Sequence, residues 1–240
     1  MKYEEMKPGQ IDEVLRTCPI AYLAWGALEW HGVHNPVGLD ALKAYNMALE
    51  LCRATGGVVL PPVYCGYQTM KPWQGFRHTL EFSKSLVRQY VYEHLENLYE
   101  EGFRLIVIVM GHYGGKHVET IKAAVAEFSE KHKYPKVLAI TDYEPASWVG
   151  VKGGDHGGKN ETSLLMYFRP ELVDINLLPG GELEQKVEGC AVNAKEATAE
   201  HGRMLTEVFV AQAAPKLREL LQEVMEEWPA PMPERLVIRS

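Results

Sequence analysis

Two imidazoles and two carboxylates lie within fifteen residues near the start of the chain, in GALEWHGVHNPVGLD at 26–40. They belong to Glu29, His31, His34 and Asp40. In an extended segment, residues two apart project to the same side, so Glu29 and His31 can reach one place together. Groups of this kind bind a metal ion, cap a helix or face water. Asp40 lies where a helix is expected to begin, so an N-cap is its alternative role.

Two later segments carry further groups of the same type. His112 follows the apolar run LIVIVMG and is flanked by glycines, which allow close approach of the backbone. A hydrogen-bonded turn histidine is the alternative there. The segment GGDHGGKNE at 153–161 adds His156 and Glu161. Glu161 could also be a helix-start carboxylate favoured by the helix dipole. His117 is expected on a solvated helix face.

The elements that must position these groups alternate between short β-rich runs and longer helical patterns. Strands are expected at 20–26, 58–67, 104–112 and 136–143. Helices are expected at 40–57, 83–102, 115–132, 161–168 and within 193–226. This alternation predicts an α/β fold, a three-layer α/β/α sandwich with a mostly parallel sheet. Because such sheets bind ligands beyond the carboxyl ends of their strands, all three polar clusters are expected at one edge.

Two proline positions and one loop add detail to this prediction. The pair Pro61–Pro62 is expected to end the second strand, and Pro215 is expected to break or kink the last helix. A loop from about 66 to 79 is expected to shape the pocket with Tyr67, Lys71, Trp73, Arg77 and His78.

Size and composition limit the classes of protein. A chain of 240 residues with 46% hydrophobic and 24% charged residues predicts one globular domain spanning 1–240. The net charge of −7 argues against nucleic-acid and anionic-membrane partners, and no stretch approaches 18 uninterrupted apolar residues. The chain has four scattered cysteines and no signal-peptide pattern, which predicts a cytoplasmic protein.

The mixture of carboxylates and imidazoles suits zinc, manganese or iron(II). One carboxylate that bridges two ions about 3.5–4 Å apart would form a two-metal hydrolytic centre. Such a centre lowers the pKa of bound water to about 7, so hydroxide is available at neutral pH. A nearby imidazole such as His156 could then deliver a proton to the leaving group.

Three motifs, taken in order, resemble the hallmarks of the creatininase (creatinine amidohydrolase) family. The first is Gly-x-x-Glu-x-His-Gly-x-His-x-Pro-x-x-x-Asp, which occurs at 26–40 with every spacing kept. The second, a strand ending in Asn-Gly-His, occurs as Met110-Gly111-His112. The third, His-x-Gly-x-x-Glu-Thr-Ser, occurs as HGGKNETS at 156–163, and TAEHGRMLTEVF at 198–209 resembles the C-terminal helix of the family.

The resemblance implies a metal-dependent hydrolase, dinuclear and often hexameric. By resemblance, Glu29 and His112 bind one ion, His31 binds the other, and Asp40 bridges them. Creatininase has a second-site Glu where this chain has Gly114, and Glu161 is the expected replacement.

Further departures concern residues beside the ligands. Trp30 and Met110 replace a usual Gln and Asn, and Lys152 stands where creatininase has a substrate-stacking Trp. Tyr113 matches a tyrosine on the substrate side. The chain is therefore expected to be a family member other than creatininase, with Tyr113, His34 and Lys152 near its substrate.

These observations predict a hydrolase that uses two divalent ions (Zn, Mn or Fe) and attacks a carbonyl with metal-bound hydroxide. The expected substrate is a small polar cyclic or linear amide, with His156 and Glu161 as catalytic residues in a homo-oligomer. One alternative is cleavage of a C–C bond in a cyclic diketone such as an oxidised inositol. Another is a catalytically inactive scaffold or a nucleotide-binding module, although neither G-x-G-x-x-G nor G-x-x-x-x-G-K-[ST] is present.

Overall fold

The computed structural model of the chain describes residues 1–228. The Pro-rich segment 229–233, which the sequence predicts to be irregular, lies outside the described residues. Within those residues, no helix has the length and apolar character needed to cross a membrane.

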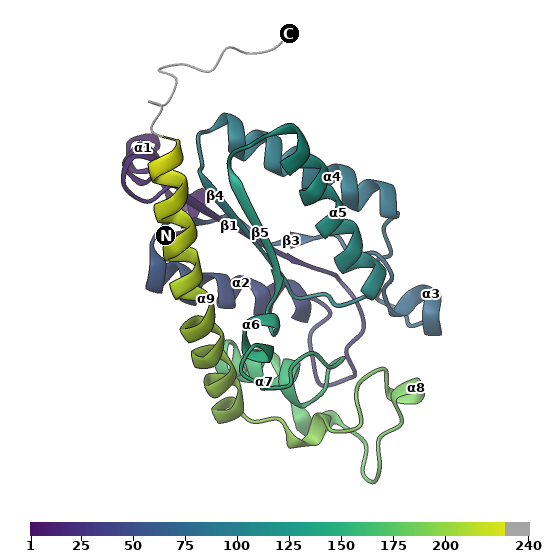
Figure 1. The fold of residues 1–240 in the computed structure, drawn as a ribbon. Helices are drawn as coiled ribbons and strands as arrows, with labels where there is room; N and C mark the ends of the chain where they lie inside the picture. The colour runs from purple at the N-terminus through teal and green to yellow at the C-terminus, as the bar shows by residue number, and fades with distance from the viewer. Residues whose placement is uncertain (229–240) are drawn as a thin grey trace.

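A parallel sheet forms the centre of the fold (Figure 1). The strand order is β2-β1-β4-β5, and β3 also pairs with β1. The strands are β1 (Ile20–Gly26), β2 (Val58–Val59), β3 (Val63–Tyr64), β4 (Leu105–Met110) and β5 (Lys136–Thr141). Every residue of β1 and β4 is buried. Continuous apolar runs predict this burial, because helices cover both faces of a parallel sheet.

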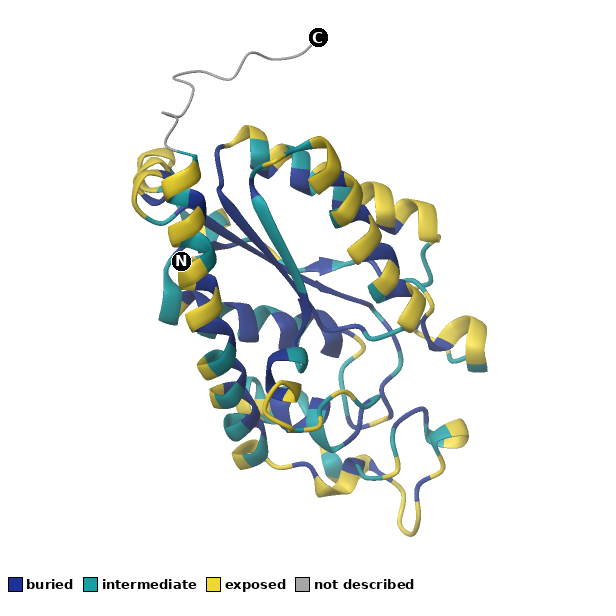
Figure 2. Ribbon diagram, viewed as in Figure 1, coloured by how far each residue is buried: buried dark blue, intermediate teal, exposed yellow. Residues whose placement is uncertain are grey.

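Helices cover the two faces in separate layers (Figures 1 and 2). On one face, α1 (Pro8–Thr17), α4 (Lys84–Glu100) and α5 (Gly115–Lys131) pack against the sheet. On the other face lie α2 (Leu39–Thr55), α7 (Lys159–Phe168) and α9 (Ala199–Glu227). The predicted three-layer α/β/α sandwich is confirmed. The shorter helices are α3 (Met70–Gln74), α6 (Glu144–Ser147) and α8 (Gln185–Glu188), with 3-10 turns at Tyr3–Glu5, Pro170–Leu172, Ile175–Leu177 and Ala194–Glu196.

Of two expectations from proline, one is confirmed with an addition and the other is corrected. The segment 58–67 holds two short strands, β2 and β3, on either side of Pro61–Pro62, and both pair with β1. The prolines interrupt the strand because they cannot donate to the ladder. By contrast, α9 is one helix that continues through the exposed Pro215, so the predicted break is wrong. Buried neighbours such as Ala214 and Leu217 pack in the core between α9, α2 and the sheet, and this packing outweighs one lost hydrogen bond.

Glycines at the ends of β1 and β4 allow α2 to approach the sheet edge. A Cβ on Gly26 would lie 2.3 Å from the backbone nitrogen of Ala41, and one on Gly111 would lie 2.1 Å from the carbonyl oxygen of Asp40. No side chain fits in either place. The first turn of α2 therefore lies directly on the carboxyl ends of the two central strands.

Candidate metal centre

Five buried polar residues from distant parts of the chain meet at the carboxyl edge of the sheet. Glu29 and His31 follow β1, His112 follows β4, Asp40 lies in the first turn of α2, and Glu161 lies in the first turn of α7. Each is at most 4% exposed. The N-cap position of α2 is Gly38, so the side chain of Asp40 does not cap the helix. It points into the cluster instead.

One half of the cluster contains Glu29, His112 and Asp40. The Nδ1 atom of His112 lies 2.7 Å from Oε1 of Glu29 and 3.2 Å from Oδ2 of Asp40. Its Nε2–H donates to the carbonyl oxygen of Tyr67 at 3.0 Å. Because a carbonyl only accepts, this bond places the proton on Nε2 and leaves Nδ1 free as a ligand atom.

The other half contains His31, Glu161 and the second oxygen of Asp40. The Nε2 atom of His31 lies 3.1 Å from Oδ1 of Asp40 and 3.8 Å from Oε2 of Glu161. The Nδ1–H of His31 donates to the carbonyl oxygen of Glu29 at 3.1 Å, which leaves Nε2 free. Asp40 thus faces both halves, with one carboxylate oxygen toward each.

The donor set fits a divalent cation. Glu29 Oε1, His31 Nε2 and both oxygens of Asp40 are buried without a hydrogen-bond partner. Buried polar atoms are rarely left unpaired, so four of them facing one centre call for a cation. Two groups have the atom spacing of a metal site and share Asp40: Glu29–Asp40–His112 and His31–Asp40–Glu161. Imidazoles and carboxylates together suit zinc, manganese or iron.

The charges of the cluster also favour a cation. Burial opposes the charged form of His31, but the carboxylate of Asp40 outweighs it and raises the pKa of His31 to about 9. Burial raises the pKa of Glu161 to about 8, although Lys43 and His31 act in the opposite direction. The raised pKa of His31 reflects the negative potential that Asp40 and Glu29 create at the centre of the cluster, and this potential attracts positive charge.

Lys43 and Asp142, which the sequence did not single out, complete the His31 and Glu161 half. The Nζ atom of the fully buried Lys43 lies 2.9 Å from Oδ2 of Asp142, 3.2 Å from Oε1 of Glu161 and 2.8 Å from the hydroxyl of Tyr113. Two signals could have found them. Asp142 directly follows a strand, and Lys43 lies one helical turn after Asp40 on a mostly apolar helix.

The backbone around α7 fixes Glu161. Asp155 accepts the N–H groups of Asn160 and Glu161 at 2.8 and 3.1 Å, so it holds the first turn of the helix. The N–H of Gly157 donates to Oε2 of Glu161 at 2.7 Å. Together with Lys43, these contacts engage both carboxylate oxygens of Glu161.

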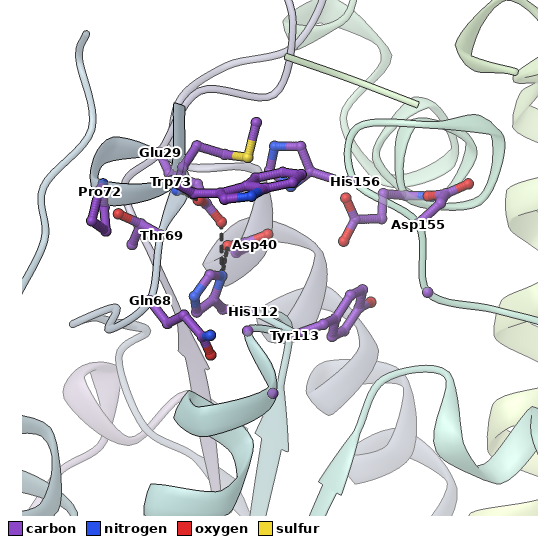
Figure 3. Close-up of a pocket in the computed structure, with 15 residues that line it drawn as sticks. Glu29, Asp40, Gln68, Thr69, Pro72, Trp73, His112, Tyr113, Asp155 and His156 are labelled. Atoms are coloured by element: carbon purple, nitrogen blue, oxygen red, sulfur yellow. Dashed lines mark hydrogen bonds and ion pairs between the residues drawn. The ribbon is translucent and has the colours of Figure 1, made fainter. Parts of the chain in front are cut away.

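A cavity of about 530 Å³ opens above the cluster. Figure 3 shows Glu29, Asp40 and His112 pointing toward one another at its base, with Trp73 above them. The walls include Gln68, Thr69, Met70, Pro72, Tyr113, Gly114, Asp155 and His156. Of the loop residues expected to shape the pocket, Trp73 lines this cavity, and Tyr67, Lys71, Arg77 and His78 do not.

His156 lies in the cavity wall beside His31. The two rings stack with centroids 4.2 Å apart, and Nε2 of His156 donates to the carbonyl oxygen of Trp30 at 2.8 Å. Burial lowers the pKa of His156 to about 4, so the imidazole is neutral near pH 7. His156 also has ligand spacing with Glu29 and His31.

The remaining predicted residues lie in different surroundings. Tyr113 lines the cavity, and its hydroxyl donates to Asp142. His34 is buried outside the cavity lining, where its Nε2 lies 3.1 Å from the Gly157 carbonyl oxygen. Lys152 is exposed and does not line the cavity. The expected solvated face for His117 is wrong, because His117 is fully buried and its Nδ1 accepts the N–H of Tyr67.

Known proteins share both the sequence pattern and the fold that carry this geometry. A family model for creatininase, described as creatinine amidohydrolase, matches residues 4–217. The creatinine amidohydrolase of Pseudomonas putida is 25% identical over 234 residues, which is 83% of this chain and 89% of that protein. The 3-dehydro-scyllo-inosose hydrolase of Thermotoga maritima is 26% identical over 165 residues, 68% of this chain, and the match spans about half (51%) of that relative.

A solved structure described as creatininase Mn has a TM-score of 0.75 and 24% identity. The match covers 90% of this chain and 97% of that one. At this identity the likeness concerns the fold.

Proposed function

The chain belongs to the creatininase family, and on that premise we propose that it is a hydrolase that uses two divalent metal ions. In this proposal it cleaves the C–N bond of a cyclic or linear amide in a small polar substrate. The observation that carries the proposal is the pair of buried donor groups that share Asp40. We also propose that residues 1–240 form one hydrolase domain.

In the proposed site, Glu29 and His112 would hold one ion and His31 and Glu161 would hold the other. Asp40 would contribute to both, since its two oxygens face opposite halves. Zinc, manganese and iron are the candidate metals. The similar solved structure named creatininase Mn supports manganese among them. When bound, such ions lower the pKa of a water to about 7 and polarise a carbonyl oxygen.

The chain contributes proton transfer and positioning. His156 is the proposed proton carrier, because its neutral ring lies in the cavity wall. Its Nε2–H donates to the Trp30 carbonyl, so Nδ1 is the atom that can accept a proton. Glu161 is the second proposed catalytic residue, because its Oε2 lies 3.8 Å from Nε2 of His31, where the ion would be held. Tyr113, held by Lys43 and Asp142, presents its ring to the substrate side of the cavity.

A second candidate reaction is hydrolysis of a C–C bond in a cyclic diketone such as an oxidised inositol. The likeness to the inosose hydrolase of Thermotoga maritima favours it. Both reactions begin with attack of water on a carbonyl carbon, so the same donor groups serve either substrate. A hexameric homo-oligomer and a cytoplasmic location stay predictions.

Elemental analysis of protein purified without added metal or chelator tests the proposal, with Asp40→Ala beside the wild type. We expect close to two transition-metal ions per chain in the wild type and a large loss in the variant, because Asp40 serves both halves. Small amides and cyclic diketones are then screened with the loaded protein. A wild type that holds no ion after incubation with zinc, manganese or iron(II) would overturn the proposal.

A further inference from the structure

The segment 67–70, which follows β3 and ends at the first residue of α3, contacts two of the proposed metal ligands through its backbone. The carbonyl oxygen of Tyr67 accepts the Nε2–H of His112 at 3.0 Å. The N–H of Met70 donates to Oε2 of Glu29 at 2.8 Å. One segment therefore orients two of the three side chains in that half of the cluster, Glu29 and His112. A role for this segment in metal binding rests on the proposed metal site.

Glu81 holds this segment in place with both of its carboxylate oxygens. Oε1 accepts the N–H of Gln68 at 2.8 Å. Oε2 accepts the N–H of Thr69 at 2.8 Å and the hydroxyl of Thr69 at 2.6 Å. Three donors on two successive residues converge on one carboxylate, and hydrogen bonds to a carboxylate are about twice as strong as bonds between neutral groups.

Gln68 needs such a restraint because its backbone is in the left-handed region, with φ at +61°. A residue with a side chain keeps this conformation only when its surroundings fix it. The second restraint is its own side chain, whose Oε1 accepts the N–H of Lys116 at 2.7 Å. Gln68 is thereby tied to Glu81 on one side and to the start of α5 on the other.

The same segment accounts for the glycine at position 114. A Cβ there would lie 2.8 Å from the carbonyl oxygen of Gln68, closer than real Cβ contacts allow. The segment occupies the space that a side chain on residue 114 would need.

We propose that Glu81 is a positioning residue for the ion held by Glu29 and His112, acting through the backbone of 67–70. The hydrogen bonds described for this segment reach neither His31 nor Glu161. Loss of Glu81 should therefore weaken one half of the metal centre and spare the other. Groups that orient metal ligands typically contribute about 10–100-fold to metal affinity.

The test is titration of chelator-treated protein with Zn²⁺ against a fluorescent chelator, for the wild type, Glu81→Ala and Glu81→Gln. Glu81→Gln keeps the shape but turns an NH₂ toward the segment's donors. Ser83→Ala is the matched control, since Ser83 caps α4 two residues away and its hydroxyl accepts the N–H of Leu86. Ser83→Ala should lower the unfolding midpoint, but the Ser83 hydroxyl bonds to Ser85 and Leu86 and not to the segment 67–70. His112→Asn identifies which binding step belongs to this half.

We expect Glu81→Ala to weaken the step that His112→Asn also weakens by about 10–100-fold, and Glu81→Gln to weaken it less. The other step and both steps of Ser83→Ala should match the wild type. Equal zinc affinities in the wild type and both Glu81 variants would overturn the inference and leave the proposed function intact. A parallel loss at both steps in Glu81→Ala would also overturn it. A wild type that binds no zinc would overturn the proposed function itself.

Discussion

The two halves of the cluster are supported in different ways. Backbone groups of the segment 67–70 orient Glu29 and His112. Buried charge supports the other half, where Lys43 lies between Asp142 and Glu161. Loss of a backbone hydrogen bond lets a ligand move, whereas loss of a buried charge leaves its partners uncompensated. Loss of a supporting group should therefore mainly lower metal affinity in the first half, and mainly lower the free energy of unfolding in the second.

The largest effect is expected from Glu161→Ala, which separates the halves directly. The variant should retain about one ion per chain, and kcat/KM should fall about 100-fold or more, because several kcal/mol of charge stabilisation are lost. Elemental analysis and steady-state kinetics measure both. Glu196→Ala is the control, since Glu196 is an exposed carboxylate paired with Lys159. Two ions retained in Glu161→Ala would show that Glu161 is not a ligand.

Lys43→Met should cause the next largest change, in stability. It leaves Asp142 and Glu161 buried without their positive partner, which costs about 3–5 kcal/mol of the free energy of unfolding. Urea unfolding in the presence of chelator measures this without a contribution from metal binding. Adding Asp142→Asn should recover part of the loss, because one uncompensated charge is then removed. A change below about 1 kcal/mol would contradict the charge-supported half.

Gly114→Ala tests the contact between position 114 and the segment 67–70. The added methyl group should reduce the free energy of unfolding by about 1–3 kcal/mol, because Gln68 would have to move. Gly115→Ala is the matched control, since a Cβ there meets nothing within 4 Å and Gly115 is the first residue of α5. It should be neutral or stabilise by about 0.4–1 kcal/mol. Equal urea midpoints for the two variants would contradict the close contact.

The smallest effect on stability is expected from Trp73→Ala, at the outer wall of the cavity. Trp73 is 62% exposed, so its loss should change the free energy of unfolding by less than about 0.5 kcal/mol. If its ring packs on the substrate, KM should rise about 2- to 10-fold. Trp148→Ala is the control, because Trp148 is also exposed but does not line the cavity. An unchanged KM in Trp73→Ala would exclude that contact.

Local patterns in the sequence predicted the sheet and most of the cluster. The apolar runs of β1 and β4 identify buried strands without reference to the rest of the chain. Polar residues at strand ends then meet by topology, which is why Glu29, His31 and His112 could be placed at one edge. The error at Pro215 has the opposite origin, because burial of neighbouring residues against another layer overrides a local rule.

Residue types and their spacing thus determined the fold class and the ligand candidates of this protein. The tertiary structure decided which groups support them. Lys43 meets Asp142 across 99 residues, Glu81 meets the segment 67–70 across a turn that includes α3, and His117 is buried against Tyr67. A lone lysine on a helix or a glutamate after a loop has no local signature of such a role. Such a residue contributes to stability only when burial removes water and folding brings an opposite charge or a free N–H within hydrogen-bond distance.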